Sequence, residues 1–294
     1  MIVVMGATGA TGSALLHRLT ALGEPTRALS RDPGRLRAGL DAATLARTEV
    51  VAADAADPDS LRAAFSGADR LFLTMANGPA QVALEIRAVE AAAAAGIGHL
   101  VKLSAPGAGP DSPVAIARGH HTVEVAVRES GVPYTVLRPY AFMQKLLLLA
   151  PGVAAGGVIT GAMADGACTY IDCRDIADVA AAALTRPGFA GHTYTLTGSR
   201  PYSQTELAGL LGGLLDRPVR YVDLPGPELH RHLTTTARMP DWLATHVVEI
   251  QRLARTRPET PDDTVVRLLG RPPRTLEAFL REHLDLFRPR AALR

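Results

Sequence analysis

The chain of 294 residues has few cysteines, few aromatic side chains and no strong excess of charge of either sign. Its two cysteines, Cys168 and Cys173, are too few for a disulfide framework and are typical of a protein from a reducing compartment. The 31 basic and 29 acidic residues leave a net charge of +2 without a basic block, which argues against nucleic-acid binding. We therefore expect a cytoplasmic globular protein.

Long hydrophobic segments and lysine are also scarce. The longest uncharged stretch, 146–164, is interrupted by Pro151 and by several glycines, so we interpret it as loop and strand and expect no membrane span. No charged segment precedes the apolar N-terminus, so we do not expect a signal peptide. Lys102 and Lys145 are the only lysines, which leaves few amines for catalysis.

What the sequence does contain is an alternation of short apolar runs and amphipathic segments. We expect strands at 1–5, 26–29, 49–53, 71–74, 100–103 and 134–137, with helices at 12–22, 81–95 and around 123–129. Such alternation predicts a parallel sheet covered by helices on both faces, and the unbroken apolar run Ile2-Val3-Val4 is typical of a strand buried on both sides.

After Pro139 the alternation becomes less regular. We expect strands at 169–171, 193–196 and 219–222, a helix at 175–184, and a helix opened by the capping box Ser203 to Glu206. The closing segment carries apolar residues on one helical face: Leu276, Phe279, Leu280, Leu284 and Phe287. The predicted fold is α/β: a Rossmann-type doubly wound parallel sheet over 1–150, continued by 169–198, and a small C-terminal α/β lobe formed by 151–168 and 199–294.

The most specific motif is the glycine turn Gly6-Ala-Thr-Gly9-Ala-Thr-Gly12, which directly follows a predicted buried strand and opens a helix. That is the context of a dinucleotide-binding loop, in which the glycines permit a tight turn, close approach to the pyrophosphate and close helix packing. The N-terminus of the helix adds positive potential for the phosphates. The turn therefore predicts a bound dinucleotide.

The end of the second predicted strand indicates which dinucleotide binds. NAD-binding proteins carry an acidic residue there, about 20 residues after the glycine turn, to hold the ribose 2′-hydroxyl. Here Ser30 and Arg31 take that position. The guanidinium of Arg31 suits a 2′-phosphate, so we favour NADP(H) over NAD(H).

Beyond the glycine turn, four segments resemble the NmrA-like family of atypical short-chain dehydrogenase/reductases: 27–33, 137–144, 170–177 and 270–279. The resemblance extends over nearly the whole chain. Members of that family include NADPH-dependent quinone and dye reductases, and also regulators that bind the nucleotide without catalysis. The resemblance therefore implies the fold and the cofactor more firmly than the reaction.

The resemblance also implies roles for individual residues. The residues that match the phosphate loop are Gly6, Thr8, Gly9, Thr11 and Gly12. Ser30 and Arg31 match the 2′-phosphate site, and Asp54 matches an adenine contact. Thr74 and Met75 match positions beside the nicotinamide ribose. Ser104 matches a hydroxyl that faces the nicotinamide or the substrate.

The usual catalytic pair of this superfamily, Tyr-x-x-x-Lys, is absent. Counting back from Glu124, the lysine position holds His121 and the tyrosine position holds Ala117. The proton must then come from another side chain or from water. We expect His121 first, because it occupies the lysine position, and Tyr140 second, because it follows a strand end; His120 and Ser104 are further candidates.

These observations predict an NADPH-dependent reductase that transfers a hydride to a C=O, C=C or C=N group of a small cyclic or aromatic molecule. Two alternatives stay open. The first is a non-catalytic NADP-binding redox sensor of the NmrA type, and the second is a non-redox isomerase or cyclase on the same fold. We expect an apolar or aromatic small-molecule partner and no metal site, and a homodimer is a further hypothesis.

Overall fold

The structure, a computed structural model, describes residues 1–289 and divides the chain into two compact units. The first unit comprises Met1–Pro139, Cys173–Leu196 and Thr264–Arg271. The second comprises Tyr140–Asp172, Thr197–Asp263 and the chain from Pro272. The division therefore differs from the predicted boundaries, since residues 140–150 belong to the second unit and 264–271 to the first.

The first unit is built on a seven-stranded parallel sheet, with the strand order β3-β2-β1-β4-β5-β6-β9. The strands are β1 (Ile2–Val4), β2 (Thr26–Ser30), β3 (Thr48–Ala52), β4 (Arg70–Leu73), β5 (His99–Leu103), β6 (Tyr134–Pro139) and β9 (His192–Leu196). The order reverses between β1 and β4, as in a doubly wound Rossmann sheet. The predicted fold class is confirmed.

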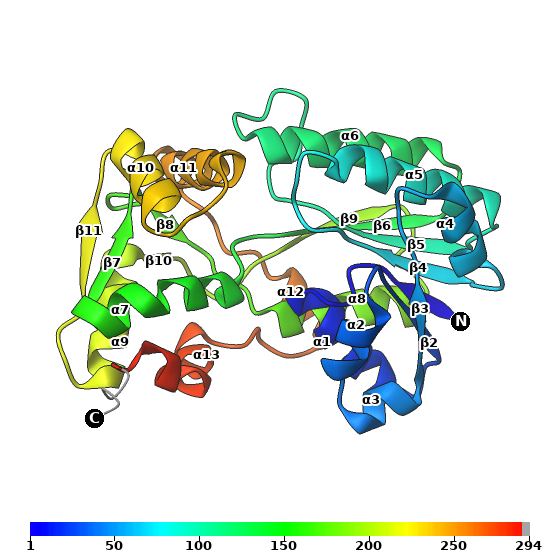
Figure 1. The fold of residues 1–294 in the computed structure, drawn as a ribbon, viewed down its shortest axis with the longest axis horizontal. Helices are drawn as coiled ribbons and strands as arrows, with labels where there is room; N and C mark the ends of the chain where they lie inside the picture. Colours follow the sequence, from blue (N-terminus) through cyan, green and yellow to red (C-terminus); the bar gives the residue numbers. More distant parts are fainter. Residues whose placement is uncertain (290–294) are drawn as a thin grey trace. The chain divides into compact units, whose positions relative to one another are not determined.

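Helices cover both faces of this sheet (Figure 1). On one face α4 (Pro58–Phe65), α5 (Gln81–Ala94) and α6 (Ala115–Glu129) pack in succession. On the other, α1 (Ala10–Ala21) packs against α8 (Cys173–Thr185). The remaining helices of this unit are α2 (Pro33–Ala38), α3 (Ala42–Ala46) and α12 (Thr264–Leu269).

The apolar alternation of the sequence accounts for this packing. Leu61 and Phe65 of α4, Leu71 of β4 and Leu100 of β5 are fully buried in one cluster with Val127 of α6. Removing such side chains from water is the main stabilising contribution, about 1.5–3 kcal/mol for each large apolar residue. The buried cluster fixes α4, α5 and α6 on the sheet, and it thereby sets where the loops at the strand ends begin.

The second unit contains two small sheets and several helices. The parallel pair is β7 (Val158–Gly161) with β11 (Arg220–Asp223), and the antiparallel pair is β8 (Ala167–Cys168) with β10 (Tyr202–Ser203). The helices are η1 (Met143–Leu149, 3₁₀), α7 (Ala150–Gly156), α9 (Gln204–Leu215), α10 (Gly226–Thr235), α11 (Asp241–Thr256), α13 (Leu276–Glu282) and η2 (Leu284–Phe287, 3₁₀). Their shared core includes Leu207, Leu211, Phe279 and Phe287.

Two local predictions in this unit are wrong. Residues 169–171 form no regular strand; β8 ends at Cys168, and Ile171 makes only an isolated bridge to Phe142. The stretch 146–164 contains α7 as well as loop and strand, because Pro151 is tolerated in the first turn of a helix and Gly157, at φ +63°, ends it.

The predicted capping box is confirmed. Ser203 Oγ accepts the Glu206 backbone N–H at 3.1 Å, and the Glu206 carboxylate accepts the Ser203 N–H at 2.8 Å. Within residues 1–289, none of the helices combines the length and the apolar character needed to cross a membrane.

Candidate active site

The predicted cofactor residues follow successive strands of the first unit. Because all strands of the sheet are parallel, the loops after β1 to β5 leave the sheet at the same edge, which is where ligands bind in open α/β sheets. The residues at that edge are the glycine turn after β1, Ser30 and Arg31 at the end of β2, Asp54 after β3, Thr74 and Met75 after β4, and Ser104 after β5.

The glycine turn depends on the missing side chains of two glycines. Gly6 has φ +68°, a left-handed conformation that favours glycine, and a Cβ there would lie 2.6 Å from the Thr74 carbonyl oxygen. A Cβ on Gly12 would lie 2.3 Å from the Gly6 carbonyl oxygen. The Gly9 N–H donates to that same Gly6 oxygen at 3.0 Å. The turn is therefore tight, and the first turn of α1 lies against it.

The N-terminus of α1 has no side-chain cap. Gly9 occupies the cap position without a side-chain hydrogen bond, and the first turn holds no acidic residue. Thr8 is exposed, whereas Thr11 is buried. Backbone N–H groups at a helix start need acceptors, and an anion supplies both the acceptors and the complementary charge. The turn thus fits the pyrophosphate of a dinucleotide.

The turn after β2 is held by the side chain of Ser30. Ser30 Oγ accepts the Asp32 N–H at 3.0 Å and donates to the Asp32 carbonyl at 2.9 Å, which fixes the turn that carries the exposed Arg31. Asp54 is also exposed, and its Oδ1 accepts the Ala56 N–H at 2.9 Å. Both charged side chains therefore stand at the solvent side of the edge, where an adenosine moiety of a dinucleotide would lie.

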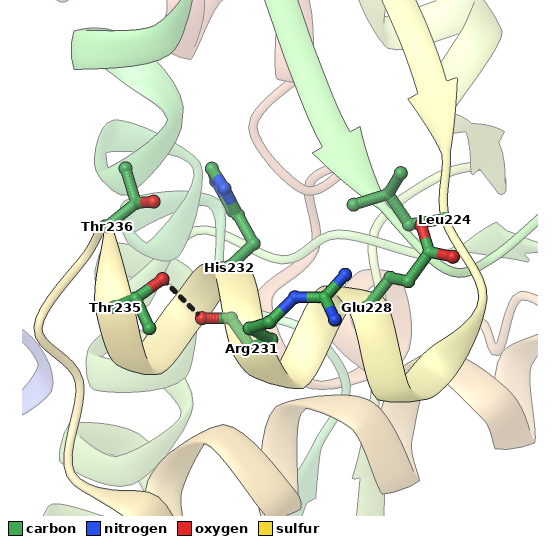
Figure 2. A pocket seen from close by; sticks show the side chains of 6 residues that line it. All are labelled: Leu224, Glu228, Arg231, His232, Thr235 and Thr236. Atoms are coloured by element: carbon green, nitrogen blue, oxygen red, sulfur yellow. Dashed lines mark hydrogen bonds between the residues drawn. The ribbon is translucent and has the colours of Figure 1, made fainter.

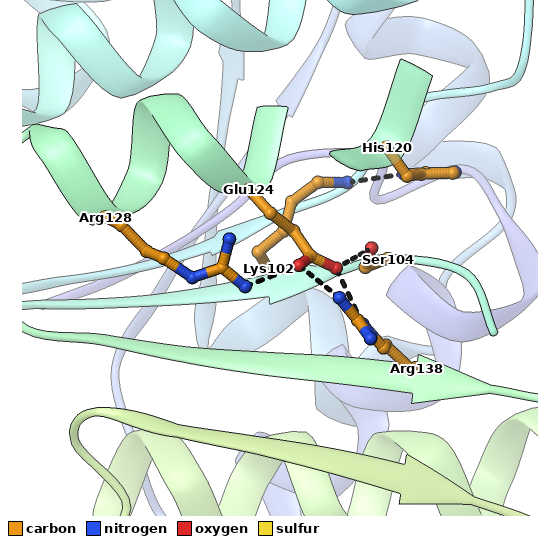
Figure 3. A network of polar contacts seen from close by, with 6 residues as sticks. All are labelled: Lys102, Ser104, His120, Glu124, Arg128 and Arg138. Carbon is orange, nitrogen blue, oxygen red and sulfur yellow. Dashed lines mark hydrogen bonds and ion pairs between the residues drawn. The ribbon is translucent and has the colours of Figure 1, made fainter. Parts of the chain in front are cut away.

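Beneath the ends of β4 and β5 lies a buried ion pair that the sequence reasoning missed. Lys102 Nζ lies 2.9 Å from Glu85 Oε2 and donates to Glu85 Oε1 at 3.1 Å; both side chains are completely buried. Lys102 also donates to the Leu103 carbonyl. Its Nζ contacts His120 Nδ1 at 3.4 Å, a contact drawn in Figure 3. Glu85 Oε1 in turn accepts the Met75 N–H at 3.1 Å.

A second buried carboxylate, Glu124, joins α6 to the ends of β5 and β6. It accepts two hydrogen bonds from Arg138, at 2.8 and 2.6 Å, one from Arg128 at 2.7 Å and one from Ser104 Oγ at 2.6 Å (Figure 3). Burial opposes ionisation, but these donors outweigh it and lower the pKa of Glu124. Because Ser104 gives its only proton to Glu124, its oxygen is left as an acceptor toward a ligand.

The two neighbouring histidines of α6 have different surroundings. His120 is 7% exposed and belongs to the buried stripe of the helix with Ala117, Glu124 and Val127. His121 is half-buried and lies beside that stripe, since consecutive helical residues point about 100° apart. The residue in the missing lysine's position is therefore not the one in contact with the buried ion pair.

Tyr140 follows β6 and belongs to the second unit. It is half-buried. Burial, together with the negative charges of Glu259 and Asp262, raises its pKa, so the phenol keeps its proton near neutral pH. Glu259 is held by Thr169, whose N–H and Oγ1 donate to Oε2 at 2.5 and 3.0 Å.

A shallow hollow on the second unit does not coincide with any predicted site residue. It has a volume of about 310 Å³ and lies over α10 (Figure 2). Its lining is largely polar or charged: Leu224, Glu228, Arg231, His232, Thr235 and Thr236. A wide, polar hollow of this kind is unlike the enclosed apolar pockets that bind small cyclic molecules.

Comparison with known proteins agrees with this geometry. A family described as NAD(P)H-binding matches residues 6–187, which include the glycine turn and the sheet edge. The chain belongs to the NAD(P)H-binding family.

Within this family, two relatives match almost end to end. The NAD(P)H azoreductase of Xenophilus azovorans is 36% identical over 98% of this chain and 99% of the relative. The (4-alkanoyl-5-oxo-2,5-dihydrofuran-3-yl)methyl phosphate reductase of Streptomyces griseus is 38% identical over 98% of this chain and 100% of the relative. The NADPH-dependent quinone oxidoreductase of Escherichia coli, solved with NADPH, has a TM-score of 0.84 and 26% identity, covering 97% of this chain and 99% of that one.

These findings confirm the predicted resemblance, the NADP(H) cofactor and the assignment to the NAD(P)H-dependent oxidoreductases. A family assignment does not by itself identify Lys102, Glu85 or Arg138 as part of the site. One signal was present in the sequence: Lys102 is one of two lysines and interrupts the apolar run at 100–103. Its acidic partner is 17 residues away on another element, a separation from which no sequence pattern predicts contact.

Proposed function

We propose that this protein is an NADPH-dependent reductase of small conjugated electrophiles, cyclic or aromatic, that carry a polarised C=O, C=C or C=N group. The observation that carries the proposal is the uncapped first turn of α1 at the β1–β4 switch point, in a chain whose full-length relatives are named as reductases. When bound, the dihydronicotinamide supplies the hydride.

The residues at the sheet edge suit distinct parts of the cofactor. The backbone around Gly9 would receive the pyrophosphate, with Thr8 and Thr11 as additional donors. At the adenosine end, Ser30 and Arg31 would hold the 2′-phosphate, and Asp54 would contact the adenine. Thr74 and Met75, after β4, would flank the nicotinamide ribose.

The substrate class rests on two considerations. The azoreductase is named for an azo group, which is an N=N double bond, and the second relative for an oxo-dihydrofuran, a ring that carries C=O and C=C groups. We propose that the second unit is the substrate-binding lobe and that Tyr140 lines it, because its phenol remains protonated and can donate a hydrogen bond.

The two cysteines are buried and form no disulfide, which supports the proposed cytoplasmic setting. We also propose that the protein is a homodimer.

A nucleotide sensor is the competing function, and one observation favours it: alanine stands at position 117, where the superfamily's catalytic tyrosine is expected. An isomerase or cyclase would likewise need no net oxidation of NADPH. These three functions differ in what happens to the nucleotide.

The experiment is NADPH oxidation against a panel of an azo dye, a 1,4-naphthoquinone, an activated enone and a cyclic imine, with calorimetric titration of NADPH, NADP⁺ and NADH. A reductase oxidises NADPH with at least one acceptor class. Absence of oxidation across the panel, combined with a strong preference for one redox state of the nucleotide, would establish the sensor instead.

A further inference from the structure

A lysine–glutamate pair with no solvent exposure needs a reason beyond stability. Removing two charges from water carries a large desolvation cost, and apolar side chains of similar volume often stabilise a fold as well or better. Lys102 and Glu85 nevertheless lie under the carboxyl ends of β4 and β5, at the edge where the cofactor is proposed to bind. What they contact there is the backbone of Met75 and the ring of His120.

The contact with His120 has a direction that follows from hydrogen-bond chemistry. An ammonium group has three donors and no acceptor. Those of Lys102 are directed to Glu85, to the Leu103 carbonyl and to His120 Nδ1. His120 Nδ1 must therefore accept, which requires that it carry no proton. In the neutral ring the proton is then on Nε2.

Figure 3 shows the Lys102 ammonium directed at the imidazole of His120, and the ring extends away from it. Glu85 couples this arrangement to the end of β4, since the carboxylate that pairs with Lys102 also accepts the Met75 N–H. One buried carboxylate thus holds both the backbone proposed to flank the nicotinamide ribose and the lysine behind the histidine.

We propose that His120 Nε2–H is the proton donor of the reduction, and that Lys102 and Glu85 are positioning residues that hold His120 in the Nε2–H tautomer. This inference rests on the proposed reductase function. It replaces the expectation that His121 is the first candidate, and it gives the buried lysine a role although the Tyr-x-x-x-Lys pair is missing.

The proton balance is complete without another reactant. Addition of hydride to the acceptor leaves an alkoxide, an enolate or an amide anion, which takes the proton from His120 Nε2. His120 Nδ1 takes a proton from Lys102 in the same step, so the imidazole stays neutral and Lys102 becomes an amine beside Glu85. After product leaves, solvent protonates Nε2 and the Nδ1 proton returns to Lys102. One hydride and one solvent proton are consumed in each turnover.

The first test determines the tautomer of His120 in the absence of cofactor and substrate. Long-range ¹H–¹⁵N correlation spectra of histidine-labelled protein at pH 7.5 distinguish a protonated from an unprotonated ring nitrogen, and the His120→Gln variant assigns the signal. We expect the Nε2–H form in the native chain and a mixture of tautomers in the double variant Glu85→Gln/Lys102→Met. That double variant leaves no buried charge unpaired and keeps an acceptor for the Met75 N–H. An Nδ1–H form in the native chain, or an unchanged tautomer in the double variant, overturns the proposal.

The second test measures single-turnover NADPH oxidation by a 1,4-naphthoquinone. Loss of the true donor lowers the rate by about 10²–10⁴-fold, so His120→Gln should do so with NADPH affinity within about twofold of the native value. The double variant should lose at least about tenfold, because the donor is no longer held in one orientation. His192→Ala is the matched control, since His192 is exposed at the amino end of β9.

A near-native rate in His120→Gln, or a larger loss in His121→Ala than in His120→Gln, would overturn the assignment. Failure of the proposed function is recognised separately. If the native chain oxidises no NADPH with any acceptor of the panel, the reductase proposal fails, while the tautomer measurement still decides whether Lys102 and Glu85 orient His120.

Discussion

Gly12 offers the sharpest prediction about cofactor binding. A methyl group at this position would lie 2.3 Å from the Gly6 carbonyl oxygen, 2.8 Å from the Gly6 carbonyl carbon and 3.0 Å from Ala7 Cα. All three neighbours are backbone atoms, so no flexible side chain can move aside. Since ordinary contact begins near 3.4 Å, Gly12→Ala requires the glycine turn and the start of α1 to separate by about 1 Å.

A displacement of this size is enough to break a hydrogen bond from the turn to a bound phosphate. A charge-assisted hydrogen bond contributes about 1.5–3 kcal/mol, so NADPH affinity should fall about 10- to 150-fold. Overpacking should also lower the free energy of unfolding by about 1–3 kcal/mol. Calorimetric titration with NADPH measures the first effect and urea denaturation the second.

Gly209→Ala is the matched control for this variant. Gly209 lies within α9, and a methyl group there would meet nothing within 4 Å, so alanine should raise helix stability by about 0.5–1 kcal/mol and leave NADPH affinity unchanged. If Gly12→Ala binds NADPH as tightly as the native chain, the turn does not hold the pyrophosphate and the reasoning is refuted.

Further outcomes are expected at three residues. Arg31→Ala should weaken NADPH binding about 10- to 150-fold by calorimetry and leave NADH nearly unaffected, since only NADPH carries the 2′-phosphate; equal losses would contradict the 2′-phosphate assignment. Glu124→Ala should cost about 3 kcal/mol in urea denaturation, the low end for a buried pair because the Arg138 guanidinium is partly exposed. Burial opposes a charge on Glu124, yet its hydrogen bonds, led by those from Arg138, hold its pKa below the usual 4.5. The stabilisation is therefore present above pH 4.5 and lost as the pH falls further, and Glu124→Gln should flatten that decline. Burial, followed by the charge of Glu259, raises the pKa of Cys168 to about 12, so a thiol reagent at pH 8 should label it only after unfolding; rapid labelling of the native chain would show that the thiol is accessible.

Much of the first unit can be predicted from local patterns. The strands β1 to β6 are short apolar runs separated by helical segments, and the sequence predicts each within one or two residues of its observed bounds. The glycine turn is recognisable because a strand, three spaced glycines and a helix start occur together within a few residues. The errors at 146–164 and 169–171 fall in the second unit. There, short strands pair with strands that are distant in the sequence, so the sequence shows no local periodicity that predicts them.

Composition, periodicity and the glycine turn are features of the sequence itself. They are sufficient to predict the fold class, the bound dinucleotide and the preference for NADP(H) that Arg31 indicates. No local sequence pattern identifies the proposed proton donor. His120 and His121 are adjacent and chemically identical in the sequence, and only the packing of α6 on the sheet decides which one meets Lys102. Lys102, Glu85 and His120 come from three elements that the sheet brings together, and Arg138 reaches Glu124 from a fourth. Contacts of this kind depend on the burial of distant apolar residues, and for that reason the tertiary structure alone determines them.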